Sequence, residues 1–120
     1  MELNYTKSID VRYDVDVFIA GGGPAGVAAA VSCAREGRSV FVAESFSAFG
    51  GAAVTMLIPA YMCFGDGINF CADGIGKEIF DRLKDESPER YKRFCPSSIP
   101  VETLKLIYDD MVDKSGAKYI

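Results

Sequence analysis

Apolar residues along the chain fall into short continuous runs and longer stretches with helical spacing. Runs rich in β-branched side chains at 14–20 and 39–43 are typical of strands in a parallel sheet covered on both faces. The segment 24–36 between them repeats small apolar residues at i, i+3, i+4 and i+7, which predicts a helix that packs closely on that sheet. The repeating residues are Val27, Ala30, Val31 and Ala34.

Two more helices are predicted in the second half of the chain. Segments 74–85 and 101–114 each place apolar residues on one side and charged residues on the other. Residues 87–100 are rich in charge and turn formers, which indicates a linker. Residues 117–120 begin a third strand. Because the sequence stops inside that strand, we expect an incomplete N-terminal fragment of a longer protein.

The predicted elements form one α/β domain over 1–120, with a parallel sheet built on a strand–helix–strand unit. We expect the strands in the order third, second, first. Ahead of them, residues 1–13 carry a weak apolar alternation at Ile9, Val11 and Tyr13, which is typical of an edge strand or of a flexible arm.

The most specific motif lies between the first strand and the first helix, where Gly21, Gly23 and Gly26 have the spacing G-x-G-x-x-G. The first glycine allows a tight turn, the second lets a pyrophosphate approach the backbone, and the third lets the helix pack tightly on the strand. Pro24 suits the first helical position, where its missing N–H would have no partner. The helix start at Pro24 and Ala25 then offers N–H groups and partial positive charge to a phosphate.

An acid follows the second strand at Glu44. In that position a carboxylate accepts hydrogen bonds from the ribose hydroxyls of an adenosine and repels a 2′-phosphate. The alternative is a structural glycine turn with a solvated acid. It explains less, because strand, turn, helix, strand and acid occur in the order that dinucleotide binding needs. The sequence therefore predicts a Rossmann-like FAD/NAD(P)-binding fold.

The loop 45–73 has no regular period and contains the paired glycines Gly50 and Gly51. Long, mostly uncharged loops of this kind are usually functional. The apolar residues of the loop 45–73 suit either the wall of a cavity or a core, and the sequence leaves both interpretations open. These residues are Met56, Leu57, Ile58, Tyr61, Met62 and Phe64.

Charge and composition argue against several classes of function. The net charge is −4 and the basic residues are scattered, whereas nucleic-acid binding needs a concentrated basic patch. The charges within 1–20 exclude a signal-peptide core, and the longest uncharged apolar stretch, 52–64, is too short to span a bilayer. We therefore expect a cytoplasmic protein.

The four cysteines form no C-x-x-C pair and the chain has no histidine, so no metal site is expected. Cys33, in the middle of the first predicted helix, is interpreted as a small buried apolar residue.

The run DVDVFIAGGGPAGVAAAVSCAREGRSVFVAE at 14–44 resembles the N-terminal FAD-binding fingerprint of FAD-dependent oxidoreductases, in the glutathione-reductase-like superfamily with two dinucleotide-binding domains. The segment FGGAAVT at 49–55 is similar to the G-G-x-x-T segment of one branch, the broad FAD-dependent oxidoreductase family. The helix at 101–114 and the third strand also fall where that family has them, so the resemblance covers nearly the whole chain.

The resemblance implies FAD as cofactor, with its pyrophosphate on the first glycine turn, its ribose on Glu44 and the flavin above the backbone of the second glycine segment. Ser45 stands where many relatives carry Arg or Lys. The residues expected to contact FAD are Gly21, Gly23, Pro24, Ala25, Gly26, Glu44, Ser45, Gly50, Gly51, Ala52 and Thr55.

The branch with covalent flavin attaches it through a histidine before the paired glycines, so this chain is expected to hold FAD non-covalently. The resemblance also implies hydride transfer with a small-molecule substrate and with NAD(P)H or another electron partner. In this family the substrate domain lies further downstream. The catalytic residues stay unassigned. Two other interpretations stay open. One is an NAD(P)-binding domain. The other is a truncated, inert nucleotide-binding or interaction fragment, whose incomplete sheet would expose apolar faces.

Overall fold

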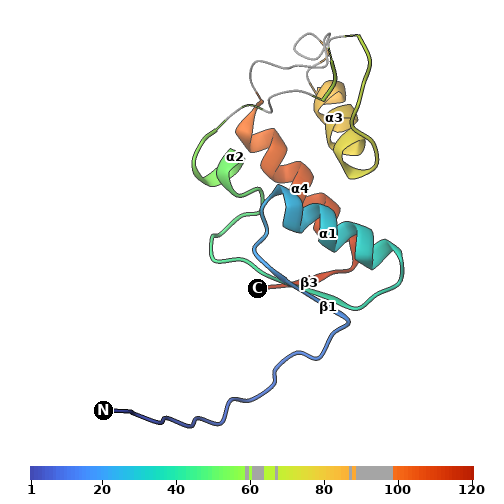
Figure 1. The fold of residues 1–120 in the computed structure, drawn as a ribbon. Helices are drawn as coiled ribbons and strands as arrows, with labels where there is room; N and C mark the ends of the chain where they lie inside the picture. The colour runs from blue at the N-terminus through green and yellow to red at the C-terminus, as the bar shows by residue number, and fades with distance from the viewer. Residues whose placement is uncertain (59, 61–63, 67, 87, 89–98) are drawn as a thin grey trace.

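The computed structural model describes residues 1–58, 60, 64–66, 68–86, 88 and 99–120. Tyr61, Met62 and nearly all of the predicted linker at 87–100 lie outside the described residues. The elements are β1 (Val17–Ala20), α1 (Pro24–Arg35), β2 (Val40–Ala43), α2 (Ala52–Thr55), α3 (Ile75–Glu86), α4 (Val101–Ser115) and β3 (Lys118–Tyr119) (Figure 1).

The three strands form one parallel sheet with β2 in the middle, which confirms the α/β fold and the strand order inferred from the sequence. The strands are shorter than predicted. β1 begins at Val17, and Asp16 and Ser39 hydrogen-bond each other just before the two strands start to pair. The Ser39 hydroxyl and N–H both donate to the Asp16 carboxylate at 2.7 and 2.8 Å, and they lower its pKa.

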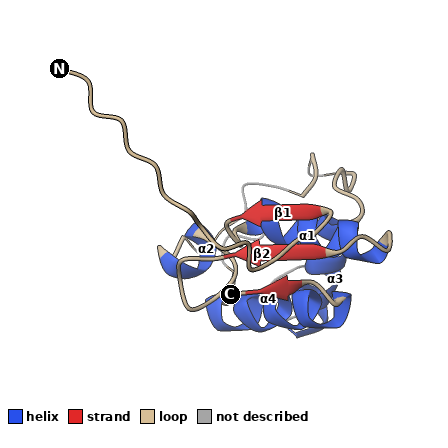
Figure 2. Cartoon of the chain, turned by 90° about the horizontal axis from the view of Figure 1, so that it is seen from below, coloured by secondary structure: helices blue, strands red, loops and turns tan. Residues whose placement is uncertain are grey.

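In the part of the chain that the structure describes, helices cover one face of the sheet and not the other (Figures 1 and 2). Ile19, Val40 and Val42 pack toward the helices and are buried. On the other face Phe18 is 63% exposed, so the expectation of a sheet covered on both faces is wrong for this chain. Phe41, which pairs with Phe18, is only 4% exposed because the ring of Tyr13 stacks on it with centroids 4.0 Å apart.

The core lies between the sheet, α1 and the inner sides of α3 and α4, where Leu83, Leu104 and Tyr108 are fully buried. On α1 the buried stripe consists of Val27, Ala30 and Val31. The prediction that Cys33 is buried is wrong. It lies at the edge of that stripe and is half-buried.

Ion pairs join the outer surfaces of the three long helices. Glu78 on α3 contacts Arg35 of α1 at 2.8 Å and Arg82 of its own helix at 2.7 Å. Arg82 also contacts Asp110 of α4 at 2.6 Å. The hydrogen bond from Arg35 lowers the pKa of Glu78. Since these side chains are partly exposed, the pairs fix the orientation of the helices more than they add to stability.

Gly26 sets the distance between α1 and β1. A Cβ atom built there would lie 1.9 Å from the Gly21 carbonyl oxygen and 3.3 Å from Cγ2 of Ile19. The backbone itself blocks a side chain at this position, which is the close helix–strand approach that the third glycine of the motif permits.

Gly26→Ala should lower the free energy of unfolding by roughly 2 kcal/mol or more, because the backbone of the turn must move. Gly76→Ala is the matched control in the first turn of α3, where a Cβ would meet only the Cβ of Ala72 at 3.6 Å. It should gain up to about 0.5–1 kcal/mol. Urea unfolding of both variants measures the difference, and equal stabilities would contradict the packing role of Gly26.

Leu83→Ala should cost about 2–5 kcal/mol, because Leu83 is 0% exposed and its loss leaves a cavity. Leu106→Ala removes the same atoms from a side chain that is 67% exposed on α4 and should change stability by no more than about 0.5 kcal/mol. Thermal and urea unfolding monitored by circular dichroism would show whether the two leucines differ in this way.

Candidate functional site

The first glycine turn connects β1 to α1 and is held against the end of β2. Gly21 has a φ of +110°, which side chains rarely adopt, and its N–H donates to the Ala43 carbonyl at 2.7 Å. The turn therefore lies at the carboxyl ends of β1 and β2, the edge of a parallel sheet where ligands bind.

The start of α1 has donors available for an anion. Pro24 occupies the first helical position, and no side chain caps the helix at Gly23. Within the described residues, the N–H groups of Gly23, Ala25 and Gly26 make no hydrogen bond to a protein acceptor. The first turn of the helix also contains no acidic residue of its own. These features suit a phosphate group.

Glu44 is fixed beside this turn by backbone N–H groups. Its Oε2 accepts from Gly22 at 2.6 Å, and its Oε1 accepts from Ser45 and Phe46 at 2.7 and 2.9 Å. The Phe46 N–H, followed by those of Gly22 and Ser45, lowers the pKa of the Glu44 carboxyl. The carboxylate is thus ionised at neutral pH, and Oε2, with one protein donor, keeps acceptor capacity for a hydroxyl group.

The second glycine segment packs against the first, backbone to backbone. The Gly50 N–H donates to the Gly22 carbonyl at 2.8 Å. A Cβ atom on Gly51 would lie 3.0 Å from the Cα of Gly23. Gly50 and Gly51 have φ values of +115° and +52°. The two segments, distant in sequence, therefore meet in a contact for which glycine is required on conformational as well as steric grounds.

A short helix, α2, follows the paired glycines and was not predicted from the sequence. The Thr55 N–H and hydroxyl both donate to the Gly51 carbonyl at 2.8 Å, so this side chain stabilises its own turn. Ala52 is exposed at the start of α2. A direct contact of Ala52, Thr55 or the exposed Ser45 with the cofactor stays a prediction.

A hollow of about 450 Å³ opens beside Glu44, beyond the carboxyl ends of β2 and β3. Phe49 and Tyr119 meet there edge to face, with ring centroids 5.3 Å apart. Its walls also include Phe46, Asp109 and Ile120. This mixture of aromatic surface and polar groups, next to a carboxylate, suits a nucleoside.

Gly22 and Phe49 belong to the site but were not singled out from the sequence. Gly22 donates to Glu44 and accepts from Gly50, and a Cβ atom on it would lie 2.3 Å from the Phe49 ring. The signals were the run of three consecutive glycines, with Gly22 in the middle, and the aromatic residue before the paired glycines. Of the loop residues that suited a cavity or a core, Phe64 is buried, whereas Met56, Leu57 and Ile58 are exposed.

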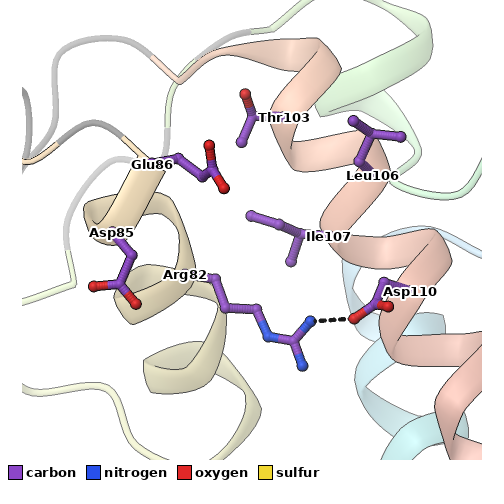
Figure 3. A pocket seen from close by; sticks show the side chains of 7 residues that line it. All are labelled: Arg82, Asp85, Glu86, Thr103, Leu106, Ile107 and Asp110. Atoms are coloured by element: carbon purple, nitrogen blue, oxygen red, sulfur yellow. Dashed lines mark hydrogen bonds and ion pairs between the residues drawn. The ribbon is translucent and has the colours of Figure 1, made fainter.

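A separate hollow of about 390 Å³ lies between α3 and α4 and shares no residue with the one beside Glu44 (Figure 3). Arg82 reaches across it from α3 to the Asp110 carboxylate of α4, while Ile107 and Thr103 form the α4 wall. The guanidinium is already paired with two carboxylates, so this hollow offers no unpaired cation to a ligand.

Two kinds of feature are absent from the described residues. No group of three or more candidate ligand side chains lies close enough together there to hold a metal ion. None of the helices in this part of the chain has the length and apolar character needed to cross a membrane.

Comparison with known proteins agrees with this geometry. The model of a family described as FAD dependent oxidoreductase matches residues 16–120. The 4-oxocyclohex-2-ene-1-carboxylate 5-dehydrogenase of Sinomonas cyclohexanicum is 36% identical over 76 residues, which is 63% of this chain and 13% of that enzyme. This chain therefore corresponds to a small part of that enzyme's length.

The crystal structure of Thermovibrio ammonificans THI4 superposes with a TM-score of 0.55 at 24% identity, over 89% of this chain and 37% of that chain. At this identity the likeness concerns the fold alone. The family match spans β1 to β3 and includes both glycine segments and Glu44. The chain belongs to the FAD dependent oxidoreductase family.

Proposed function

We propose that this chain is the FAD-binding portion of a flavin-dependent oxidoreductase and holds FAD without a covalent bond. The observation that carries the proposal is the direct connection between the first glycine turn, Glu44 and the paired glycines, through Gly22. A phosphate-binding turn, a ribose-binding acid and a second glycine segment thereby form one continuous surface.

Each part of this surface has a separate role. The N–H groups of Gly23, Ala25 and Gly26 would bind the FAD pyrophosphate, and Glu44 Oε2 would accept from the adenosine ribose. The hollow at Phe49 and Tyr119 suits the adenine. Gly50 and Gly51, which add no side chains, would leave room for the ribityl and flavin side of the cofactor.

When bound, the flavin supplies the hydride chemistry, and the protein contributes position, electrostatics and exclusion of water. The negative charge of Glu44 disfavours cofactors with a 2′-phosphate, which supports FAD over NADP at this turn. Turnover further requires a small-molecule substrate and an electron partner, for which NAD(P)H is our candidate.

The purified chain should take up FAD and keep the visible absorption bands of oxidised flavin through gel filtration. Denaturation should release the flavin, because no covalent bond holds it. A chain that stays colourless with FAD but binds NAD in an equilibrium titration would identify an NAD domain instead. A folded chain that binds neither would contradict the proposed function.

Glu44→Gln should weaken FAD binding by roughly tenfold to a hundredfold, because a charged acceptor of the ribose and of Gly22 is lost. Glu36→Gln makes the same change at an exposed position at the end of α1 and should leave FAD affinity unaltered. Flavin fluorescence titration measures the FAD dissociation constants of the two variants. Thermal unfolding without FAD shows whether the Glu44 variant is folded, and equal affinities in folded variants would refute the role of Glu44.

The stability that Glu44 contributes should be lost in acid. Its pKa is lowered in the folded state, so the contribution is fully present above the unfolded-state pKa and disappears as the pH falls through the folded-state value. Between about pH 5 and pH 3, the free energy of unfolding of Glu44→Gln should therefore fall less steeply than that of the unaltered chain. Parallel slopes in urea unfolding across this range would show that the carboxylate does not stabilise the turn.

A further inference from the structure

The paired glycines lie against a side chain from the middle of α4, far along the chain from both glycine segments. A Cβ atom built on Gly50 would lie 3.0 and 3.1 Å from Cδ2 and Cε2 of Tyr108. The edge of the tyrosine ring therefore fills the space in which any other residue at this position would place its side chain. Cγ2 of Val54, from α2, borders the same space.

Tyr108 is held firmly by the core. It is 0% exposed and belongs to the buried stripe of α4, between Leu104 and Met111. Side chains in such close packing keep one rotamer and transmit a displacement to their neighbours. Both α1 and α2 pack against α4, and α2 lies beside it in Figure 1. The helix core therefore fixes where the ring lies, and the glycine segment has to fit against it.

Gly50 is restrained from two sides as a result. Its N–H donates to the Gly22 carbonyl at 2.8 Å, and the Tyr108 ring limits its movement toward α4. The next residue, Gly51, packs on the first turn, where a Cβ atom on it would lie 3.0 Å from the Cα of Gly23. Any shift of Gly50 would carry Gly51 with it, because the two are joined by one peptide unit. The distance between the two glycine segments therefore depends on the ring.

We propose that Tyr108 is a positioning residue for the cofactor. Its ring holds Gly50 and Gly51 at the distance from the first glycine turn that FAD needs. This inference rests on the proposed function, in which the pyrophosphate lies on the first turn and the flavin side runs along the paired glycines. Tyr108 is fully buried and does not touch the cofactor itself, so it acts through the backbone of the paired glycines. Sites that are supported in this way bind more tightly, because less ordering is needed on binding.

A role in stability alone makes a different prediction. Leu83 is also 0% exposed but lies on α3, and it is not among the atoms nearest to Gly50. Truncation of Leu83 therefore weakens the core without opening space beside the paired glycines. If Tyr108 only stabilised the fold, truncation of either side chain would leave the FAD dissociation constant of the folded protein unchanged.

Hydrogen exchange of the FAD-free chain, followed by NMR, tests the support directly. Tyr108→Leu should make the Gly50 N–H exchange faster relative to the N–H of Val31, in the core of α1, by about tenfold. Comparison with Val31 removes the part of the change that comes from global unfolding. Leu83→Ala is the matched control and should not raise this ratio.

FAD binding by the folded variants tests the consequence. Tyr108→Leu should raise the FAD dissociation constant by about tenfold and alter the visible circular dichroism of the bound flavin. Leu83→Ala should change neither, and Tyr108→Phe, which keeps the ring, should restore both. Val54→Ala truncates the other side chain beside Gly50 and is a milder second variant, in case Tyr108→Leu does not fold. It should raise the exchange ratio and the dissociation constant in the same direction.

The proposal is overturned if Tyr108→Leu and Leu83→Ala, both folded, bind FAD with equal dissociation constants. An unchanged exchange ratio at Gly50 in a chain that binds FAD normally would also overturn it, and would leave the proposed function intact. A folded, unaltered chain that takes up no FAD would instead overturn the proposed function, and with it the role of Tyr108 toward the cofactor.

Discussion

The contact between two backbone segments, Gly21–Gly23 and Gly50–Gly51, is the constraint on which the site depends. Larger residues do not fit here: a Cβ atom on Gly51 would lie 3.0 Å from the Gly23 Cα, and one on Gly22 or Gly50 would lie 2.3 Å from the side chain of Phe49 or Val54. The hydrogen bond from Gly50 to Gly22 holds the segments in register. Glu44 completes the connection because its carboxylate accepts from the Gly22 N–H, while the carbonyl of the same residue accepts from Gly50. Three stretches of chain therefore form one rigid surface.

The groups on this surface are oriented in advance, which supports the proposed binding of a dinucleotide. The charge of Glu44 is stabilised by backbone N–H groups before any ligand arrives, and the positive end of α1 has no acidic neighbour in its first turn. Affinity is gained when groups are already oriented, because less ordering is needed on binding. Gly26 adds to this by holding α1 close to β1, which fixes the direction of the donors relative to the sheet.

The two faces of the sheet differ in how far they are covered. One face is closed by α1 and α4 over buried Val40 and Val42, and the other is left to Tyr13, Phe41 and Phe18. Parallel sheets are normally covered on both faces, whereas Phe18 on this face is 63% exposed. The FAD dependent oxidoreductase family match extends over all three strands and the helices that pack on them.

The sequence by itself determined the first strand–turn–helix–strand unit, Glu44 at its end, the helices α3 and α4, and the strand order. These features are local: glycine spacing, helical periodicity and apolar runs are complete within about 30 residues, and the topology of such units has few alternatives. Only the tertiary structure decided that Gly50 meets Gly22, that Phe49 lies over the first turn, and that α2 follows the paired glycines. It also decided that Phe18 is exposed while Phe41 is covered. These outcomes depend on backbone contacts between segments far apart in the chain, and no periodic pattern of side chains records where two backbones will touch.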